Sequence, residues 1–323
     1  MISHKSRKRL VNIFRWLLLF AFIFLFLQYF HANQSYFTKA ISNLSIKPLV
    51  WMFVLSIVSN FITALKYHFT LRAQNVKPTL YASFKFYVIG RFLGMFMPQS
   101  GTIYRGIQFK KYFKVSYVQY AASFAAITWL TYFWSVIFLL WILIWEGQPI
   151  YFFNINPFYL LIACFLCFIL VPLLGNAILS RITFSNSMFS NYLAKVSSIF
   201  RSIFSLISKG KLIIGFSMLT ILSLTVVLLF YHIAFTTINI SLKLHTLLFL
   251  VVLLQFSTIF NLTPGNTGIL EFIAGFATLS SGFTMADGIL VMVEVRLVTL
   301  ISVTFLSLLM GARDLIALFR SSP

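Results

Sequence analysis

The sequence predicts an all-α integral membrane protein, a polytopic bundle of transmembrane helices. Hydrophobic residues make up 60% of the 323 residues and charged residues only 9%, whereas a soluble domain carries about 25% charged residues. The mean hydropathy is +0.94. Several apolar runs also reach the length of about 20 residues that a helix needs to cross a bilayer. We therefore expect residues 1–323 to form a single integral membrane domain.

Six apolar runs are long enough to be full transmembrane helices. Their length identifies them better than their periodicity, because a helix in lipid is apolar on most faces. The predicted spans cover about residues 12–30, 48–65, 117–145, 157–179, 212–235 and 288–310.

Two further apolar segments are interrupted by turn residues. The segment 79–115 contains Pro98-Gln99-Ser100-Gly101, and the segment 246–282 contains TPGNTG at 263–268. Proline removes a backbone donor and glycine relaxes the backbone, so both sequences predict a helix break. We interpret the segments as re-entrant or broken hairpins that enter from opposite faces, a pattern that marks transporter binding sites. Eight full crossings are the alternative, but they would conflict with the basic cluster at 105–114.

The basic residues predict the orientation and the lipid partners. The net charge is +20, from 25 Lys and Arg against 5 Asp and Glu. These cations cluster between apolar runs, which is typical of cytoplasmic loops facing anionic lipids and not of a nucleic-acid-binding surface. We expect a cytoplasmic (inner) membrane protein with both termini cytoplasmic, contacting anionic inner-leaflet lipids. The stretch with Lys66, Arg72 and Lys77 is predicted to be one such loop. The segment 181–211 is an amphipathic helix on the inner leaflet or a helix packed on neighbouring loops.

Charged residues at membrane depth are the candidate functional groups. A charge at the centre of a spanning helix costs about 2.5 to 3.5 kcal/mol on insertion scales, so retained charges are usually paired or functional. The candidates are Arg91, Arg105, Glu271, Glu294 and Arg296.

Glu271 has two interpretations. With Gly268 as the N-cap, Glu271 is the third helical residue, and its carboxylate can accept a hydrogen bond from the cap amide. Alternatively, it pairs with an arginine or binds a proton or a cation. Glu294 and Arg296 are two residues apart, hence about 200° apart on a helix, and cannot both face one partner. We predict a Glu271–Arg296 pair, either functional or a fixed contact that only sets packing.

Arg105 is predicted to lie in the first turn after the first break. A cation there opposes the helix dipole. A carboxylate partner or an anionic ligand would offset this cost, since a helix N-terminus with an arginine is a good phosphate site. The alternative is an arginine that extends to the inner membrane interface.

No motif for catalysis or metal binding is present. The five histidines lack the spacing of metal ligands, and Cys164 and Cys167 are spaced as CxxC but lack the other two ligands that a structural zinc needs. The sequence contains no P-loop and no GxSxG. We expect no catalytic residue, no metal and no cofactor within this chain.

Three motifs in order resemble a known family. They are MPQSGTIYR at 97–105, TPGNTGILE at 263–271 and VEVRLVTLISVTFLSLLMG at 293–311. They resemble the lysylphosphatidylglycerol synthase transmembrane region, the flippase-like domain of multiple peptide resistance factor proteins, over roughly residues 10–315. The resemblance implies transbilayer movement of a phospholipid or a lipid-linked glycan. The matching positions are Pro98, Gly101, Arg105, Pro264, Gly265, Gly268, Glu271 and Arg296.

The chain departs from the family pattern at two places. Asn266 and Thr267 stand where another glycine is common, and Met95 and Phe96 stand where a polar residue is expected.

The preferred hypothesis is a translocator of an anionic phospholipid or lipid-linked glycan. In it the matching positions, together with Arg91 and Glu294, bind the substrate. A membrane-embedded glycosyl or acyl transferase and an accessory subunit of envelope glycan synthesis are the alternatives. A partner enzyme and a second copy of the chain stay open as partners.

Overall fold

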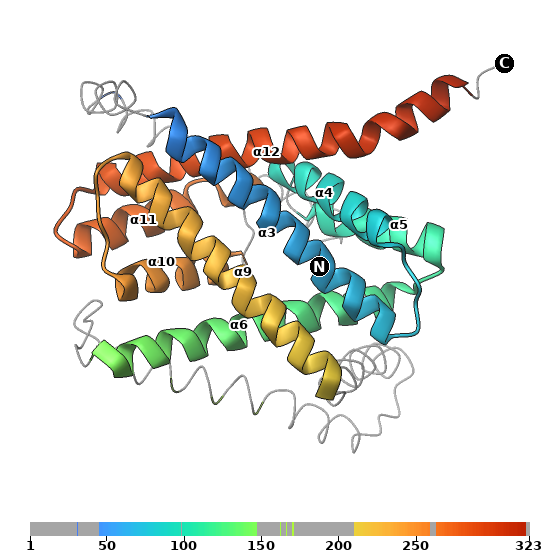
Figure 1. The fold of residues 1–323 in the computed structure, drawn as a ribbon, viewed down its shortest axis with the longest axis horizontal. Helices are drawn as coiled ribbons and strands as arrows, with labels where there is room; N and C mark the ends of the chain where they lie inside the picture. The colour runs from blue at the N-terminus through green and yellow to red at the C-terminus, as the bar shows by residue number, and fades with distance from the viewer. Residues whose placement is uncertain are drawn as a thin grey trace, which may run out of the picture. The chain divides into compact units, whose positions relative to one another are not determined.

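The computed structural model describes residues 31, 45–97, 99–146, 162, 166, 170, 210–258 and 263–320. Within these residues the fold is all-helical, with eight α-helices, one short 3-10 helix and no strand (Figure 1). The predicted all-α class is therefore confirmed. The elements are α3 (Ile46–Ala73), α4 (Leu80–Phe96), α5 (Ser100–Phe113), α6 (Tyr117–Glu146), α9 (Gly210–Thr237), α10 (Leu244–Ser257), η1 (Pro264–Asn266), α11 (Ile269–Ser280) and α12 (Met285–Arg320).

Four of the described helices are long and apolar enough to cross a membrane. They correspond to the spans predicted at 48–65, 117–145, 212–235 and 288–310, and they comprise Ile46–Ala73, Tyr117–Ile142, Ile213–Thr237 and Met285–Gly311. The predicted span 12–30, the predicted span 157–179 except for residues 162, 166 and 170, and nearly all of the amphipathic segment 181–211 lie outside the described residues. The number of full spans therefore stays a prediction.

The second predicted span is longer than expected, and this corrects the loop assigned to Lys66. Helix α3 continues through Lys66 to Ala73 and ends where Asn75 adopts a left-handed φ of 62°. Lys66 is buried, with 2% of its surface exposed, and its ammonium lies 5.9 Å from the centroid of the Phe216 ring. No proline or glycine occurs between Lys66 and Asn75, and the apolar lysine stem packs well beside aromatic rings.

Both predicted helix breaks are present. Helices α4 and α5 are separated by residues 97–99, where Gln99 has a φ of 63°, although Pro98 lies outside the described residues. In the second segment, α10 and α11 are separated by η1. The helix–break–helix pattern is confirmed, and whether these segments are re-entrant stays a prediction.

The chain divides into two compact units. Unit 1 comprises Met1–Ile57, Ile89–Thr102 and Val227–Pro323, and unit 2 comprises Val58–Val88 and Ile103–Val226. The long helices α3 and α9 and the shorter helices α4 and α5 each have residues in both units. The units are described separately below, and the predicted single domain stays a prediction.

The core of unit 1 is built around α12. Helix α11 packs against both α12 and α10. The closest approach is at Gly288, where a Cβ atom would lie 2.3 Å from the carbonyl oxygen of Ala274, so only glycine fits. A buried hydrogen bond of 2.6 Å between the hydroxyls of Ser56 and Ser302 joins α3 to α12. Interhelical hydroxyl bonds and small residues are typical of helix packing in membranes.

Unit 2 has an aromatic core. Phe109 on α5 is 1% exposed, and its ring contacts those of Phe86 and Tyr120 at centroid distances of 5.5 and 6.0 Å. The Trp134 indole donates a 2.9 Å hydrogen bond to Ser217, which joins α6 to α9. Aromatic contacts of this geometry add stability beyond the apolar area that they bury.

Candidate functional site

The break before α11 is a tight turn that requires left-handed backbone. Gly265, Asn266 and Gly268 have φ values of 57°, 55° and 88°. Glycine enters this region without steric cost, and asparagine tolerates it better than most residues. The Asn266 amide also donates a 3.0 Å hydrogen bond to the Ser257 carbonyl, which fastens the turn to α10. Asn266, which stands where a glycine is common in the family that the motifs resemble, is therefore compatible with this left-handed turn.

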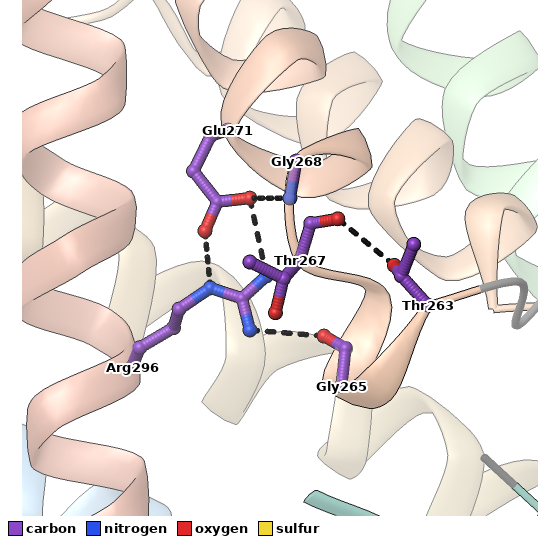
Figure 2. A network of polar contacts seen from close by, with 6 residues as sticks. All are labelled: Thr263, Gly265, Thr267, Gly268, Glu271 and Arg296. Carbon is purple, nitrogen blue, oxygen red and sulfur yellow. Dashed lines mark hydrogen bonds and ion pairs between the residues drawn. The ribbon is translucent and has the colours of Figure 1, made fainter. Parts of the chain in front are cut away.

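Glu271 connects the turn to α12. The Gly268 N–H donates a 2.8 Å hydrogen bond to Glu271 Oε2. The Arg296 guanidinium donates to the same carboxylate through Nε, at Oε1, and through Nη2, at Oε2 with a distance of 3.1 Å (Figure 2). The predicted Glu271–Arg296 pair is confirmed, and the predicted capping contact is present beside it. Glu271 therefore caps α11 and pairs with arginine at the same time.

Arg296 also holds the irregular backbone of the turn. Its Nη1 donates a 2.9 Å hydrogen bond to the Gly265 carbonyl (Figure 2). A guanidinium has five N–H donors, and the three contacts described account for three of them. Among the described residues no partner is present for the other two. The Arg296 side chain is 28% exposed against 10% for Glu271, so the arginine is the more accessible member of the pair.

Two further polar side chains lie near this pair. The Tyr231 hydroxyl on α9 is close enough to interact electrostatically with Glu271, Arg296 and Arg91. Arg91 lies on α4, in the part of that helix that belongs to unit 1. The site thus combines two arginines, one carboxylate and one phenol from four helices. We call these residues, with Gly265 and Gly268, the arginine–glutamate site.

Glu294 belongs to a different contact. It is 5% exposed, and its Oε2 lies 2.6 Å from the Thr237 hydroxyl of α9. Arg296, two residues along α12, turns toward α11 and η1 instead. The prediction that the two residues face different elements is confirmed.

Arg105 lies in unit 2 and is enclosed by tyrosines. Its guanidinium is 5.1 and 5.3 Å from the ring centroids of Tyr67 and Tyr87, and its Nε donates a 3.2 Å hydrogen bond to the Tyr120 hydroxyl. Only 9% of Arg105 is exposed, so its side chain is enclosed by protein. Cation–π contacts of a desolvated guanidinium are favourable by about 2 kcal/mol.

The position of Arg105 in its helix also differs from the prediction. Helix α5 begins at Ser100, which places Arg105 in the second turn and not the first. The dipole effect falls off within the first turn, so the predicted dipole penalty is small. Sequence reasoning did not identify the three tyrosines, because they come from α3, α4 and α6.

The remaining predicted positions shape the backbone. A Cβ atom at Gly101 would lie 1.9 Å from the Gly90 carbonyl oxygen, so glycine permits the close contact of α4 and α5. A Cβ atom at Gly265 would lie 3.3 Å from Arg296 Nη1. Pro264 begins η1. The part of the chain that the structure describes contains no group of three His, Cys, Asp or Glu residues suited to a metal ion.

Comparison with known proteins assigns the family. The family model described as Lysylphosphatidylglycerol synthase TM region matches residues 13–307. Comparisons with curated proteins and with solved structures give no match. The match covers most of the chain and includes all four long apolar helices except the last residues of α12. The chain is therefore a multi-pass membrane protein that belongs to the lysylphosphatidylglycerol synthase TM region family.

Proposed function

We propose that this protein translocates an anionic phospholipid or a lipid-linked glycan across the cytoplasmic membrane, and that the arginine–glutamate site binds the headgroup. The family suggests a role in lipid or envelope metabolism. The observation that carries the proposal is the Arg296–Glu271 pair beside the broken segment at η1.

The first support is the energetic cost of the site. Charges in an apolar bundle are costly even when paired, and a buried pair is weak evidence for stability alone. Here the ion pair lies beside irregular backbone, which is tolerated at membrane depth only against protein or a wet cavity. This combination is typical of transporter binding sites.

The second support is the bonding capacity of Arg296. Its two remaining N–H groups and its partial exposure allow an incoming phosphate to bind before the carboxylate leaves. Phosphate and carboxylate offer a guanidinium the same bidentate geometry. A phosphate could then displace Glu271 from Arg296, while the Gly268 N–H still stabilises the carboxylate. Arg296 would thus alternate between two arrangements, paired with Glu271 or bound to the headgroup phosphate, as the headgroup enters and leaves.

Arg91 and Tyr231 would contribute to headgroup binding. Arg91 adds a second positive charge, which balances a phosphate when Glu271 is also ionised. The Gly265 carbonyl accepts a hydrogen bond from Arg296, and the turn that positions it is shaped by Pro264, Gly265 and Gly268. Arg105, Pro98 and Gly101 remain predicted substrate positions, and the tyrosines around Arg105 give that residue a structural role as well.

The proposed orientation follows the basic loops. Both termini would be cytoplasmic, and the basic clusters would contact anionic lipids of the inner leaflet.

A transport assay tests the proposal. Purified protein is reconstituted into vesicles that contain a fluorescent phosphatidylglycerol, and a membrane-impermeant quencher is added outside. Translocation makes inner-leaflet label accessible, so quenching should go beyond the outer-leaflet fraction. Arg296→Gln should remove this gain, and Lys47→Gln, which neutralises an exposed cation of α3, should keep it.

Two outcomes would contradict the proposal. One is a folded wild-type protein that accelerates no phospholipid and no polyprenyl-linked lipid. The other is Arg296→Gln protein that elutes as a single species in detergent and still transports at the wild-type rate.

A further inference from the structure

Thr237 has more short contacts than it has hydrogens. Its hydroxyl oxygen lies 2.6 Å from the Ala234 carbonyl oxygen and 2.6 Å from Glu294 Oε2. Both distances are at the short end of the range for O–H···O hydrogen bonds. One hydroxyl hydrogen shared between two acceptors would give longer contacts, so each contact needs its own hydrogen.

The second hydrogen can come only from Glu294. A carbonyl oxygen never donates, so the threonine hydrogen is directed to Ala234, as in the common back-bonded threonine of a helix. The hydrogen between Thr237 and Glu294 must then be carried by the carboxyl group. A carboxylate has no hydrogen, whereas a carboxylic acid has one O–H donor.

The rest of the environment also favours a neutral acid. Glu294 is 5% exposed, and its Oε1 has no hydrogen-bond partner in the described part of the chain. The surrounding core cluster of unit 1 is apolar and includes Phe230, Ala234 and Val298. A carboxylate with a single donor in such a place would lack most of its hydrogen bonds, which costs much more free energy than one unpaired carbonyl oxygen.

Among the residues that the structure describes, no charged group is paired with Glu294. Glu271 and Arg296 bind each other. Asp287 lies about two helical turns from Glu294 along α12, and its carboxylate accepts hydrogen bonds from Thr284. The titratable groups of the adjacent helices in unit 1 are Tyr231 and His232 on α9, His245 on α10, Arg91 on α4 and Lys47 on α3. Within the described chain, none of these forms a hydrogen bond or an ion pair with Glu294.

We propose that Glu294 is a proton-binding site at the contact of α9 and α12, occupied by a proton in the conformation that the structure shows. Release of that proton to water would turn the donor into an acceptor, and Thr237 would have to leave Ala234 to stay bonded. The ionised state therefore disfavours this packing of α9 on α12. The inference does not depend on lipid translocation, and it identifies the proton as the ligand.

Infrared difference spectroscopy of the purified full chain tests the proposal. A protonated carboxyl group has a C=O stretching band that is distinct from carboxylate bands and shifts in heavy water. At neutral pH the wild type should show this band. Glu294→Gln should abolish it, and the matched variant Glu271→Gln should keep it, because both oxygens of Glu271 accept hydrogen bonds from the Arg296 guanidinium.

A second variant keeps the test decisive if Glu294→Gln folds poorly. Thr237→Val removes the hydroxyl and preserves the side-chain shape. A protonated Glu294 then loses its acceptor, so the band should remain but move to the frequency of a less strongly bonded acid. Absence of the band in folded wild type at neutral pH would overturn the proposal. A band that persists unchanged in folded Glu294→Gln protein would overturn it as well.

Discussion

Replacing Glu271 by glutamine would leave Arg296 as an uncompensated cation in unit 1. Removing one partner of a buried ion pair typically costs about 3 to 5 kcal/mol, because the other charge stays buried. Here Arg296 is 28% exposed, so the protein does not fully enclose it, and the loss should be smaller than for a fully buried pair. A glutamine oxygen can also accept one guanidinium bond and still cap Gly268. We therefore expect Glu271→Gln to lower the free energy of unfolding by about 2 to 3 kcal/mol.

Replacing Arg296 by glutamine should lower the free energy of unfolding by less. In Arg296→Gln the remaining carboxylate keeps the hydrogen bond from Gly268, and it can neutralise itself by binding a proton. Arginine has no such option, because it stays charged at any accessible pH. The double variant removes both charges, so its loss should be smaller than the sum of the single losses by about 2 kcal/mol.

Reversible unfolding in mixed detergent micelles measures this cycle. Each variant is unfolded by increasing the fraction of denaturing detergent, and the free energies are compared at a common detergent composition. A control cycle pairs Glu271→Gln with Lys47→Gln, whose side chain is exposed and outside the site, and should be additive. Effects of Glu271→Gln and Arg296→Gln that add to within about 0.5 kcal/mol would show that the pair contributes no coupling, and the reasoning would be refuted.

Three other replacements test the close contacts of the fold. Gly101→Ala should destabilise the contact of α4 and α5 by about 1 to 3 kcal/mol, because its Cβ would meet the Gly90 carbonyl oxygen at 1.9 Å. The control Gly94→Ala should be nearly neutral in the same unfolding assay, because its Cβ would lie 4.0 Å from the Gly101 nitrogen. Gly288→Ala should lower the thermal unfolding midpoint by forcing α11 from α12, and Gly311→Ala, whose added Cβ meets no atom of the described residues within 4 Å, should leave the midpoint unchanged. Equal midpoints for the two variants would contradict the packing. Tyr120→Phe removes the acceptor of a buried guanidinium bond and should cost about 1 to 3 kcal/mol, and a midpoint equal to that of the wild type would show that the bond contributes little.

The broken segments could be predicted because their signals are local. Proline and glycine restrict or relax the backbone wherever they occur, so TPGNTG at 263–268 indicates a turn in any context. The capping contact of Glu271 follows from its three-residue spacing from Gly268. The partner of Glu271 was also predictable for two reasons. Few cations lie in the apolar part of the sequence. Arg296 is two residues from Glu294 and therefore points to the other side of its helix, where it can reach a different element.

The partners of Arg105 and Glu294 could not be predicted in this way. They depend on the rotation of each helix about its own axis, and helices that are apolar on most faces carry almost no periodic signal for that rotation. Tyr67, Tyr87 and Tyr120 are separated by whole helices in the sequence, and nothing local distinguishes them from other tyrosines. Thr237 is 57 residues from Glu294. Lys66 was misassigned for a related reason, since a charged residue at a span end predicts a loop unless the partner ring is known.

Helix α12 carries both the Glu294–Thr237 contact and the Arg296–Glu271 contact, on residues two positions apart. Glu294 contacts Thr237 of α9, and Arg296 pairs with Glu271 of α11 and donates a hydrogen bond to the Gly265 carbonyl of η1. Because both side chains leave the same turn in nearly opposite directions, a rotation of α12 about its axis would strain both contacts together. An anionic headgroup that draws Arg296 from Glu271 would therefore also change the geometry at Thr237. We therefore expect proton binding at Glu294 and headgroup binding at Arg296 to influence each other through α12. The two side chains lie on opposite faces of this helix and need no direct contact for this coupling.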